Sequence, residues 1–508
     1  MTHLRSRRRR IAAPLGLVLT LATLGVAPAA AQAATSAEVP TATTQTGPKL
    51  PYVVNTRTDH RTISAVEKAI AKAGGEVVIT YRQIGVIVVH STNPSFGEQI
   101  RKVRGVQSAG ATRTAPLAPA GITQEGGTDR LSAAEAAKVS GEAGPGQEPL
   151  EADQWDLRAI GADKAAKINP GSGKVTVGVI DTGVDDTHPD LAPNFSASQS
   201  ASCVGGKPDT SPGAWRPTDP THDHGTHVAG EIAAARNGVG VAGVAPGVKV
   251  AGIKVSEPDT QLFFPESVVC AFVFAADKGI EITNNSYYVD PWLYNCMDDP
   301  DQRAIVDAVN RSQLYAQRKG TLNVAAAGNS NHDLDSDAIV DDSSPDDSTP
   351  VERTIDPHEC FDIPTQLPGV VTVSSTGVKG AKSYFSTYGK GVVDVAAPGG
   401  DKYQIPDTPS KNGRILSTLP GGGWGFKQGT SMASPHAAGV AALLKSKYPW
   451  AGPTALQSML KAQADNPGCP TEPYDGDGDG VVDAWCKEGK RTNGFYGAGI
   501  VDALDAVN

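Results

Sequence analysis

The sequence predicts an α/β fold: a mostly parallel sheet with helices on both faces, preceded by a small α/β plait. From Trp155 onward, short runs rich in β-branched residues alternate with helical stretches. These runs are almost continuously apolar, as strands of a sheet covered on both faces must be. Before them, within residues 51–115, a strand, a helix, a hairpin and a second helix follow one another. In the longer region, such alternation indicates a parallel sheet connected by crossover helices.

The first element is a predicted export signal at residues 1–33. Residues 1–10 are basic, residues 11–30 are apolar and uncharged, and residues 31–33 place alanine at both recognition positions of a signal-peptidase site. A membrane-anchoring helix is the alternative, but proline and glycine interrupt the short apolar run. The general secretory and twin-arginine routes both stay open. We expect a secreted, extracellular protein that has no membrane segment after the signal is cleaved.

The second element is the plait, which a linker follows. Its expected strands and helices are Pro51–Val54, Ile63–Ala73, Glu76–Thr80 with Val86–His90, and Phe96–Val103. Residues 116–150 are rich in Ala, Gly, Pro, Glu and Gln, and they hold only one weak helical period, at residues 131–139. This composition predicts an exposed linker of the kind that proteases cut.

The third element is the main sheet with its helices. Strands are expected at Val175–Ile180, Val248–Lys254, Ile280–Thr283, Leu322–Ala326 and Val370–Val373. Helices between them are expected at about Gly225–Ala235, Ser267–Asp277 and Gln302–Lys319. In open parallel sheets, functional residues gather beyond the carboxyl ends of the strands.

Charge and cysteine content narrow the class of protein. Residues 1–150 hold 17 Lys+Arg and 10 Asp+Glu, which leaves 28 and 45 for residues 151–508, a net charge of −17 there. A body this acidic argues against nucleic acid as a partner, because phosphate binding is driven by positive charge. All six cysteines lie after residue 200, and an even number in an exported chain favours disulfides. Six cysteines allow 15 pairings, among which only Cys469 with Cys486 is favoured because they bracket one short loop.

Three residues supply the parts of an acyl-transfer site. Asp181 ends a predicted strand, His224 opens a predicted helix, and Ser431 begins a helix that runs to about Lys447. Such chemistry needs a hydroxyl nucleophile, an imidazole that takes its proton and a carboxylate that orients the imidazole. Alone, each residue has an ordinary structural role as a turn residue, a packed histidine or a helix N-cap. Together, their chain order is that of the subtilisin arrangement and differs from the α/β-hydrolase order.

From about residue 151 to its end, the chain resembles the subtilisin-like serine proteases. The resemblance lies in VIDTGVDDTHPDL around Asp181, HDHGTHVAGEIAA around His224 and GTSMASPHAAGVAALL around Ser431. It implies a monomeric serine endopeptidase that hydrolyses polypeptides through an acyl-enzyme, with these three residues as the catalytic triad. It also implies that the side-chain amide of Asn329 forms part of the oxyanion hole. A binding or structural protein on an inactive protease scaffold is the alternative.

The same resemblance divides the chain into parts. Residues 34–115 would be a propeptide, whose plait at about 51–115 assists folding and then inhibits the enzyme as its own bound partner. Residues 116–150 would be the linker and residues 151–508 the catalytic domain. The mature chain would then start between about residues 112 and 153. An independent binding module is the alternative for the plait.

The resemblance also assigns a substrate pocket to Ser286, Tyr287 and Gly328. Ser286 matches the serine of the family's Ser-Leu-Gly segment, along which an extended substrate adds as a strand. Here Tyr287 and Tyr288 replace the leucine and the glycine. The two rings either narrow the pocket or only pack at the surface.

Structural calcium is the expected cofactor, at two loops. The resemblance assigns one site to the side chains of Asp190 and Asn237 and the carbonyls of Val239 and Val241, which are oxygen ligands of the kind that calcium prefers.

The second loop has carboxylates at the spacing of calcium-binding loops: Asp475, Asp477, Asp479 and Asp483. Cys486 stands where such a loop carries a bidentate glutamate, so a solvated acidic turn is the alternative.

No catalytic metal is expected. His222, His224 and His227 are spaced as in some zinc hydrolases, but Thr226 stands where the zinc pattern has aspartate. Residues 333–352 hold seven Asp and one Glu and predict a solvated surface loop. If that loop reaches the substrate cleft, its charge would favour basic substrates.

Overall fold

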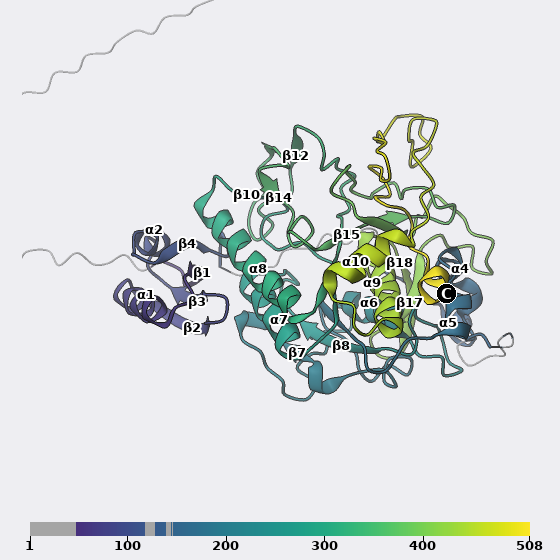
Figure 1. Cartoon of the computed structure of the whole chain (residues 1–508), viewed down its shortest axis with the longest axis horizontal. Coiled ribbons are helices and arrows are strands. Elements are labelled where there is room, and N and C mark those ends of the chain that lie inside the picture. The colour runs from purple at the N-terminus through teal and green to yellow at the C-terminus, as the bar shows by residue number, and fades with distance from the viewer. Residues whose placement is uncertain (1–46, 117–126, 139–143, 145) are drawn as a thin grey trace, which may run out of the picture. The chain divides into compact units, whose positions relative to one another are not determined.

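The computed structural model describes residues 47–116, 127–138, 144 and 146–508 (Figure 1). All of the described residues belong to one compact unit. The predicted export signal lies outside the described residues. Among the described helices, none is both long enough and apolar enough to span a bilayer.

The predicted plait is present, and we call it the leader plait. Its elements are β1 (Leu50–Thr56), α1 (His60–Lys72), β2 (Gly75–Tyr81), β3 (Val86–Ser91), α2 (Phe96–Arg101) and β4 (Val106–Ala111). The strands are antiparallel in the order β2-β3-β1-β4. Helix α1 begins where the Asp59 carboxylate accepts a hydrogen bond from the Thr62 N–H at 2.9 Å. Its apolar face, Ile63, Val66 and Ile70, is buried.

The main sheet has seven strands, all parallel, in the order β16-β15-β11-β9-β6-β8-β7. The strands are β6 (Thr176–Asp181), β7 (Ala201–Ser202), β8 (Lys249–Lys254), β9 (Ile282–Asn285), β11 (Leu322–Ala326), β15 (Val371–Thr376) and β16 (Val395–Pro398). The five predicted strands are therefore confirmed. Strands β7 and β16, at the two edges, were not predicted.

Helices cover both faces of this sheet, as predicted. Helices α6 (His224–Ala233) and α9 (Thr430–Lys447) share a core with Val177 and Val179 of β6. Helices α7 (Pro265–Asp277) and α8 (Pro300–Lys319) share a second core with Ile180. Because side chains alternate along a strand, Asp181 lies on the same face as Val177 and Val179. The last residue of β6 therefore points toward the side that carries α6 and α9.

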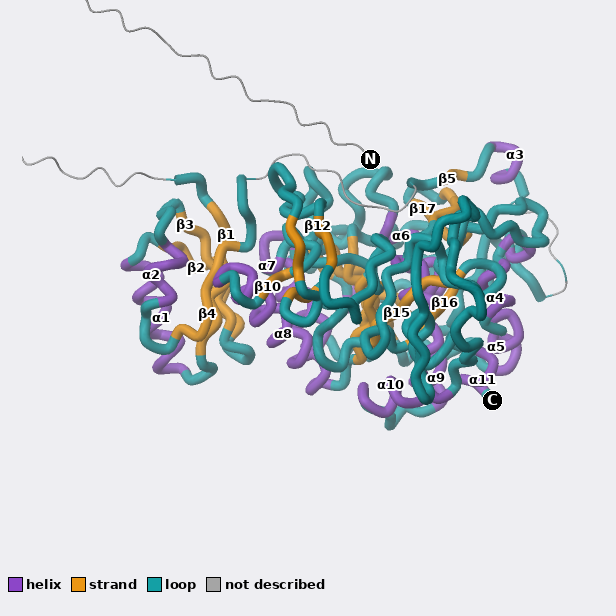
Figure 2. Tube along the Cα trace, turned by 90° about the horizontal axis from the view of Figure 1, so that it is seen from above, coloured by secondary structure: helices purple, strands orange, loops and turns teal. Residues whose placement is uncertain are grey.

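The leader plait packs on α7 and α8 (Figures 1 and 2). The Asn55 amide donates to the Ala304 carbonyl at 2.9 Å, and Arg311 donates to the Thr56 carbonyl at 2.8 Å. Gly110 lies so close to α8 that an added Cβ would stand 2.4 Å from the Asp301 Cα, so only glycine fits there. Val53, Val86 and Val88 of the plait belong to the same apolar cluster as α7 and α8.

The predicted linker is not wholly exposed. Asp129–Arg130 form strand β5, which pairs with β18 (Gly423–Lys427) of the main body. Leu150 is buried in a cluster that includes Trp424. A helix was predicted at residues 131–139, and among the described residues of that stretch only α3 (Ala133–Ala136) is helical. The prediction of an exposed linker is thus wrong at Leu150, which an apolar contact buries, whereas Asp129 and Arg130 are exposed although backbone pairing fixes them to the main body.

Smaller elements complete the described chain. They are η1 (Glu151–Asp153), α4 (Trp155–Ala159), α5 (Ala162–Ile168), η2 (Ala197–Gln199), η3 (Val204–Gly206), β10 (Asn295–Cys296), β12 (Ile339–Asp341), β13 (Arg353–Ile355), β14 (Cys360–Phe361), β17 (Ile415–Leu419), α10 (Pro453–Ala462) and α11 (Ala503–Val507). The disulfides are Cys203–Cys270, Cys296–Cys360 and Cys469–Cys486. The favoured Cys469–Cys486 pairing is confirmed.

Candidate active site

Asp181 and His224 form a buried hydrogen-bonded pair. The Asp181 carboxylate, wholly buried at the end of β6, lies 2.8 Å and 3.0 Å by its two oxygens from His224 Nδ1. Gly225 allows this approach, since an added Cβ would stand 2.5 Å from the Gly183 carbonyl oxygen. The carboxylate also accepts the Thr182 N–H at 2.6 Å. The pair fixes the ring so that Nδ1 faces the carboxylate and Nε2 is left for another partner.

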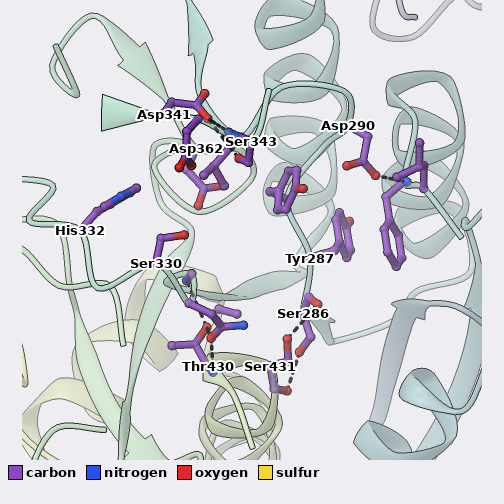
Figure 3. A pocket seen from close by; sticks show the side chains of 18 of the residues that line it. Ser286, Tyr287, Asp290, Ser330, His332, Asp341, Ser343, Asp362, Thr430 and Ser431 are labelled. Atoms are coloured by element: carbon purple, nitrogen blue, oxygen red, sulfur yellow. Dashed lines mark hydrogen bonds between the residues drawn. The ribbon is translucent and has the colours of Figure 1, made fainter. Parts of the chain in front are cut away.

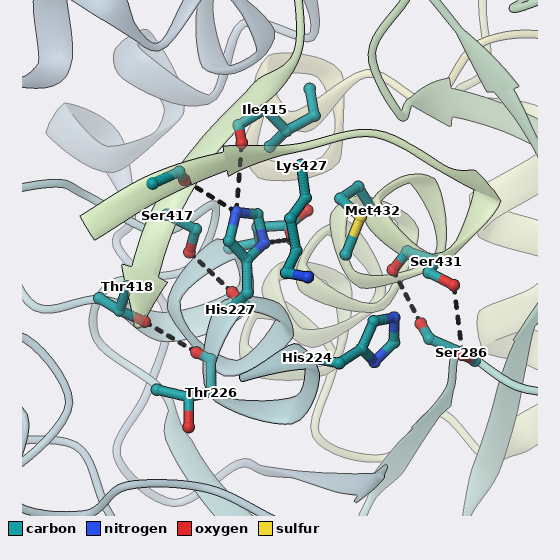
Figure 4. A network of polar contacts seen from close by, with 12 residues as sticks. His224, Thr226, His227, Ser286, Ile415, Ser417, Thr418, Lys427, Ser431 and Met432 are labelled. Atoms are coloured by element: carbon teal, nitrogen blue, oxygen red, sulfur yellow. Dashed lines mark hydrogen bonds and ion pairs between the residues drawn. The ribbon is translucent and has the colours of Figure 1, made fainter. Parts of the chain in front are cut away.

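Ser431 lies beside this pair, at the second residue of α9. Ser431 and His224 line the same cavity of about 560 Å³ (Figure 4). No hydrogen bond joins them among the described residues; the Ser431 hydroxyl donates instead to the Ser286 carbonyl at 3.2 Å. The Ser286 hydroxyl donates in return to the Ser431 carbonyl at 2.8 Å. Transfer of the Ser431 proton to His224 therefore requires rotation of the serine side chain, a small adjustment of the kind common in ligand-free sites.

Asn329 presents its amide to the same cavity. Its Oδ1 accepts the Thr430 N–H at 2.8 Å and the Thr430 hydroxyl at 2.9 Å. These two donors identify Oδ1 and leave the Nδ2 hydrogens without a partner among the described residues. Gly328, which donates its N–H to the Thr430 hydroxyl at 3.1 Å, also lines the cavity. The fold thus places one side-chain amide donor in the cavity that also holds Ser431.

Tyr287, labelled in Figure 3, and the neighbouring Tyr288 both line the cavity and are held firmly. Tyr287 is buried, stacks on Phe263 with 4.9 Å between ring centres, and donates to Asn285 Oδ1 at 2.9 Å. Tyr288 donates to Asp346 Oδ2 at 2.8 Å. The interpretation that they pack only at the surface is wrong, because both rings form walls of the cavity.

Four carboxylates that were not individually predicted from the sequence line this cavity: Asp290, Asp341, Asp342 and Asp362. Asp341 and Asp342 belong to the acidic segment 333–352, which therefore reaches the cavity and is more than a solvated loop. Asp362 has one carboxylate oxygen buried without a hydrogen-bond partner, and burial raises the pKa of this group well above its usual range. No local motif marks Asp362, because the Cys296–Cys360 disulfide and the surrounding loops bring it here.

The first predicted calcium loop fits a cation in part. One oxygen of Asp190 is buried and unpartnered, whereas Oδ2 accepts from the Trp424 indole at 2.9 Å and from the Val241 N–H at 3.1 Å. Burial raises the pKa of Asp190 to about 6. Asn237 Oδ1 already accepts the Val239 N–H at 3.0 Å. The unpartnered Asp190 oxygen is the feature that suits a cation.

At the second predicted calcium loop, the carboxylates of Asp475, Asp477 and Asp483 lie within 4.8 Å of one another. Asp479 is not in this group and instead accepts the Val481 N–H at 2.7 Å. The prediction for Asp479 stays a prediction. No second group of three possible metal-binding side chains occurs among the described residues, so His222, His224 and His227 form no zinc cluster there.

A buried charge cluster supports the helices that carry the site. His436 on α9 lies 3.0 Å from Asp156 Oδ2 and 3.3 Å from Glu231 Oε2, and all three are buried. Glu231, on α6, also contacts His227 Nδ1 at 2.8 Å. Burial acts to lower the pKa of His436, but hydrogen bonds and charge from both carboxylates raise it to about 10. The cluster ties α4, α6 and α9 together.

Comparison with known proteins agrees with this geometry. Residues 172–499 match the Subtilase family. Subtilisin BL of Lederbergia lenta is 30% identical over 330 residues, which cover 65% of this chain and 96% of that protein. Fervidolysin of Fervidobacterium pennivorans is 27% identical over 423 residues, covering 79% of this chain but only about half, 53%, of fervidolysin. The epidermin leader peptide processing serine protease of Staphylococcus aureus shares the fold with a TM-score of 0.65 at 23% identity, over 91% of this chain and 98% of that one. The chain therefore belongs to the subtilase family of serine-type endopeptidases.

Proposed function

We propose that the protein is a secreted serine endopeptidase, made as a self-processing zymogen, with Asp181, His224 and Ser431 as its catalytic triad. The observation that carries this proposal is the buried Asp181–His224 pair, which opens on the cavity that also holds Ser431 and the Asn329 amide. Secretion rests on the export signal at residues 1–33. We further propose that the mature enzyme is a monomer.

The geometry supports a two-step reaction. His224 takes the proton of the Ser431 hydroxyl while its oxygen attacks the peptide carbonyl, and Asp181 stabilises the imidazolium that forms. The Asn329 amide and the Ser431 N–H at the start of α9 donate to the developing oxyanion. His224 then protonates the leaving amine, and water hydrolyses the acyl-enzyme by the same route. In subtilisin, loss of the matching side-chain donor costs about 10²–10³ in turnover.

An active-site fluorophosphonate tests this function directly. We expect it to label Ser431 in the processed chain and to abolish hydrolysis of casein. Labelled peptides from a digest would identify the serine by mass spectrometry. Hydrolysis that continues after complete labelling, or a chain that stays unlabelled while it hydrolyses casein, would contradict the proposal.

Contacts on both sides of the expected processing cut support the zymogen. On the amino-terminal side of the cut, the Thr114 N–H donates to Asp347 Oδ2 at 2.7 Å, which holds the end of the leader against the main body. On the carboxyl-terminal side, Gly127 lines a small cavity together with His224 and Ser431. We therefore propose that residues 34–115 form the propeptide and that it is cut between residues 116 and 127. The rest of the predicted linker then stays with the catalytic domain, residues 151–508.

We also propose that the enzyme prefers a basic side chain in the cavity beside Ser431. Asp362 offers a buried carboxylate with an unpartnered oxygen, and Asp341 and Asp342 add negative charge to the wall. Burial disfavours the ionised form of Asp362 and raises its pKa, so a lysine or arginine of the substrate would supply the positive charge that stabilises the carboxylate. Ser286, Tyr287 and Gly328 would form the remaining walls around the bound chain.

Asp362→Asn should reverse this preference. Removing the charge while keeping the shape should lower kcat/KM for peptides with arginine at the cut by roughly 30-fold or more, since one partner of a buried charge pair is lost. Matched peptides with leucine should change little. Asp407→Asn, at a position outside the cavity, is the control. Equal losses for arginine and leucine peptides would argue against a charge-reading role.

Calcium binding at the two predicted loops stays a proposal. Asp190, with Asn237 and the carbonyls of Val239 and Val241, would hold one ion, and Asp475, Asp477 and Asp483 would hold the other. An ion bound to the folded state stabilises it. Chelation with EDTA should therefore lower Tm, and added calcium should restore it. A Tm that does not respond to either treatment would exclude a stabilising site at these loops.

A further inference from the structure

A buried arginine at the end of the leader occupies an acidic pocket of the main body. The Arg113 guanidinium contacts Glu257 Oε1 at 2.5 Å and Glu266 Oε1 at 3.0 Å. Its central carbon lies 3.8 Å from the centre of the Phe264 ring. Only 9% of the Arg113 side chain is exposed, and only 1% of that of Glu266. One cation is thus enclosed by two carboxylates and an aromatic face.

The pocket itself is built by the main body alone. Glu257 follows β8, while Phe264 and Glu266 lie at the start of α7. Glu266 Oε2 is buried without a hydrogen-bond partner, and no second cation pairs with either glutamate within the described ranges. When the leader departs, two neighbouring buried carboxylates lose their partner. Such an arrangement favours binding of a new cation, because like charges in a poorly solvated site repel each other.

The chain next to Arg113 is held through its backbone and one hydroxyl. Asp347 accepts the N–H groups of Thr114 at 2.7 Å and Ala115 at 3.4 Å, and it also accepts the Thr114 hydroxyl. Arg113 is therefore the charged side chain that is recognised in this segment. The neighbouring Asp346 bonds to Tyr288, which lines the cavity with Ser431. The pocket thus lies on the path by which a chain enters that cavity from its amino-terminal side.

We propose that Glu257, Glu266 and Phe264 form a substrate subsite for an arginine side chain on the amino-terminal side of the scissile bond, which Arg113 occupies in the precursor. This inference rests on the proposed function. It adds an arginine to the substrate sequence, besides the basic residue expected in the cavity beside Ser431. Arginine suits the pocket better than lysine, because its planar guanidinium stacks on the Phe264 ring while its Nη2 bonds both carboxylates.

Peptides copied from residues 108–127 test the subsite without changing the enzyme. One peptide keeps Arg113 and the other carries citrulline, which has the same shape without the charge. Each would be fluorescently labelled and titrated by anisotropy against the processed chain after treatment with diisopropyl fluorophosphate. We expect the citrulline peptide to bind roughly 30-fold or more weakly, because a buried charge pair is lost. Equal affinities would overturn the proposal.

Variants of the pocket provide the matched controls. Glu257→Gln combined with Glu266→Gln should bring the two peptides to similar affinity, whereas Glu359→Gln, at an exposed glutamate, should preserve the difference. A difference that survives in the double variant would also overturn the proposal. Casein hydrolysis before inhibition reports on the proposed function separately. An enzyme that cuts casein but binds both peptides equally refutes the subsite alone, and one that binds them differently without cutting casein refutes the catalysis alone.

Discussion

Ser431→Ala should produce a chain that keeps its leader and hydrolyses casein roughly 10⁶-fold more slowly, the loss known for the nucleophile of subtilisin. The residual rate would come from the Asn329 amide and from substrate binding, which the variant retains. N-terminal sequencing of the chain secreted from a protease-deficient host, together with casein assays, measures both effects. The retained leader is expected because Gly127, on one side of the proposed cut, lines a small cavity with Ser431, while Asp347 holds Thr114 on the other side.

Ser458→Ala, at an exposed serine of α10, is the matched control and should mature normally. If the Ser431 variant starts at the same residue as the wild type in that host, another agent makes the cut. If it also keeps its activity, Ser431 is not the nucleophile. The two readouts therefore separate processing from catalysis.

His436→Ala should lower the free energy of unfolding by about 3–5 kcal/mol, because it leaves the buried carboxylates of Asp156 and Glu231 without their cation. Urea unfolding followed by circular dichroism measures this loss. His358→Ala, at an exposed histidine, should change stability little. A loss below about 1 kcal/mol would show that the cluster does not need its charge.

The stabilisation by His436 also has a defined pH dependence. Its pKa rises from an ordinary value of about 6.5 to about 10 in the folded state. The contribution is therefore complete below about pH 6.5 and is lost as the pH rises through about 10. Burial lowers the pKa of Lys382 to about 7, so this residue makes stability depend on pH in the opposite direction. Lys382 is present in both the wild type and the His436→Ala variant, so its contribution cancels when their stabilities are compared. The advantage of the wild type over the variant should therefore be larger at about pH 6 than at pH 8 and should shrink further toward pH 10.

The sequence predicted those parts of the fold that are encoded locally. Strands β6, β8, β9, β11 and β15 were predicted because each is a nearly continuous apolar run. Strand β4, with the sequence VQSAGA, has no such pattern and becomes a strand only by pairing with β1. Strand β16 is short and ends in proline, so it gives no local signal either.

The residues of the site differ in the same way: some carry a local sequence signal and others do not. Asp181, His224 and Ser431 each stand within a long motif, and the structure gathers them around one cavity. Asp362 and the glutamates of the Arg113 pocket carry no motif, because their role depends on which distant segments fold against them. The network of Asp156, Glu231 and His436 spans 280 positions of sequence and was invisible for the same reason.

The leader plait shares an apolar cluster and buried hydrogen bonds with α7 and α8. If the leader plait is the propeptide proposed above, cutting the chain would leave these contacts unchanged and would remove only the covalent tether, which keeps the plait at a high effective concentration. Cleavage and activation would then be separate events, and activation would be a dissociation that depends on dilution. An enzyme released into a large volume would lose the plait, whereas the same molecules kept crowded together would rebind it.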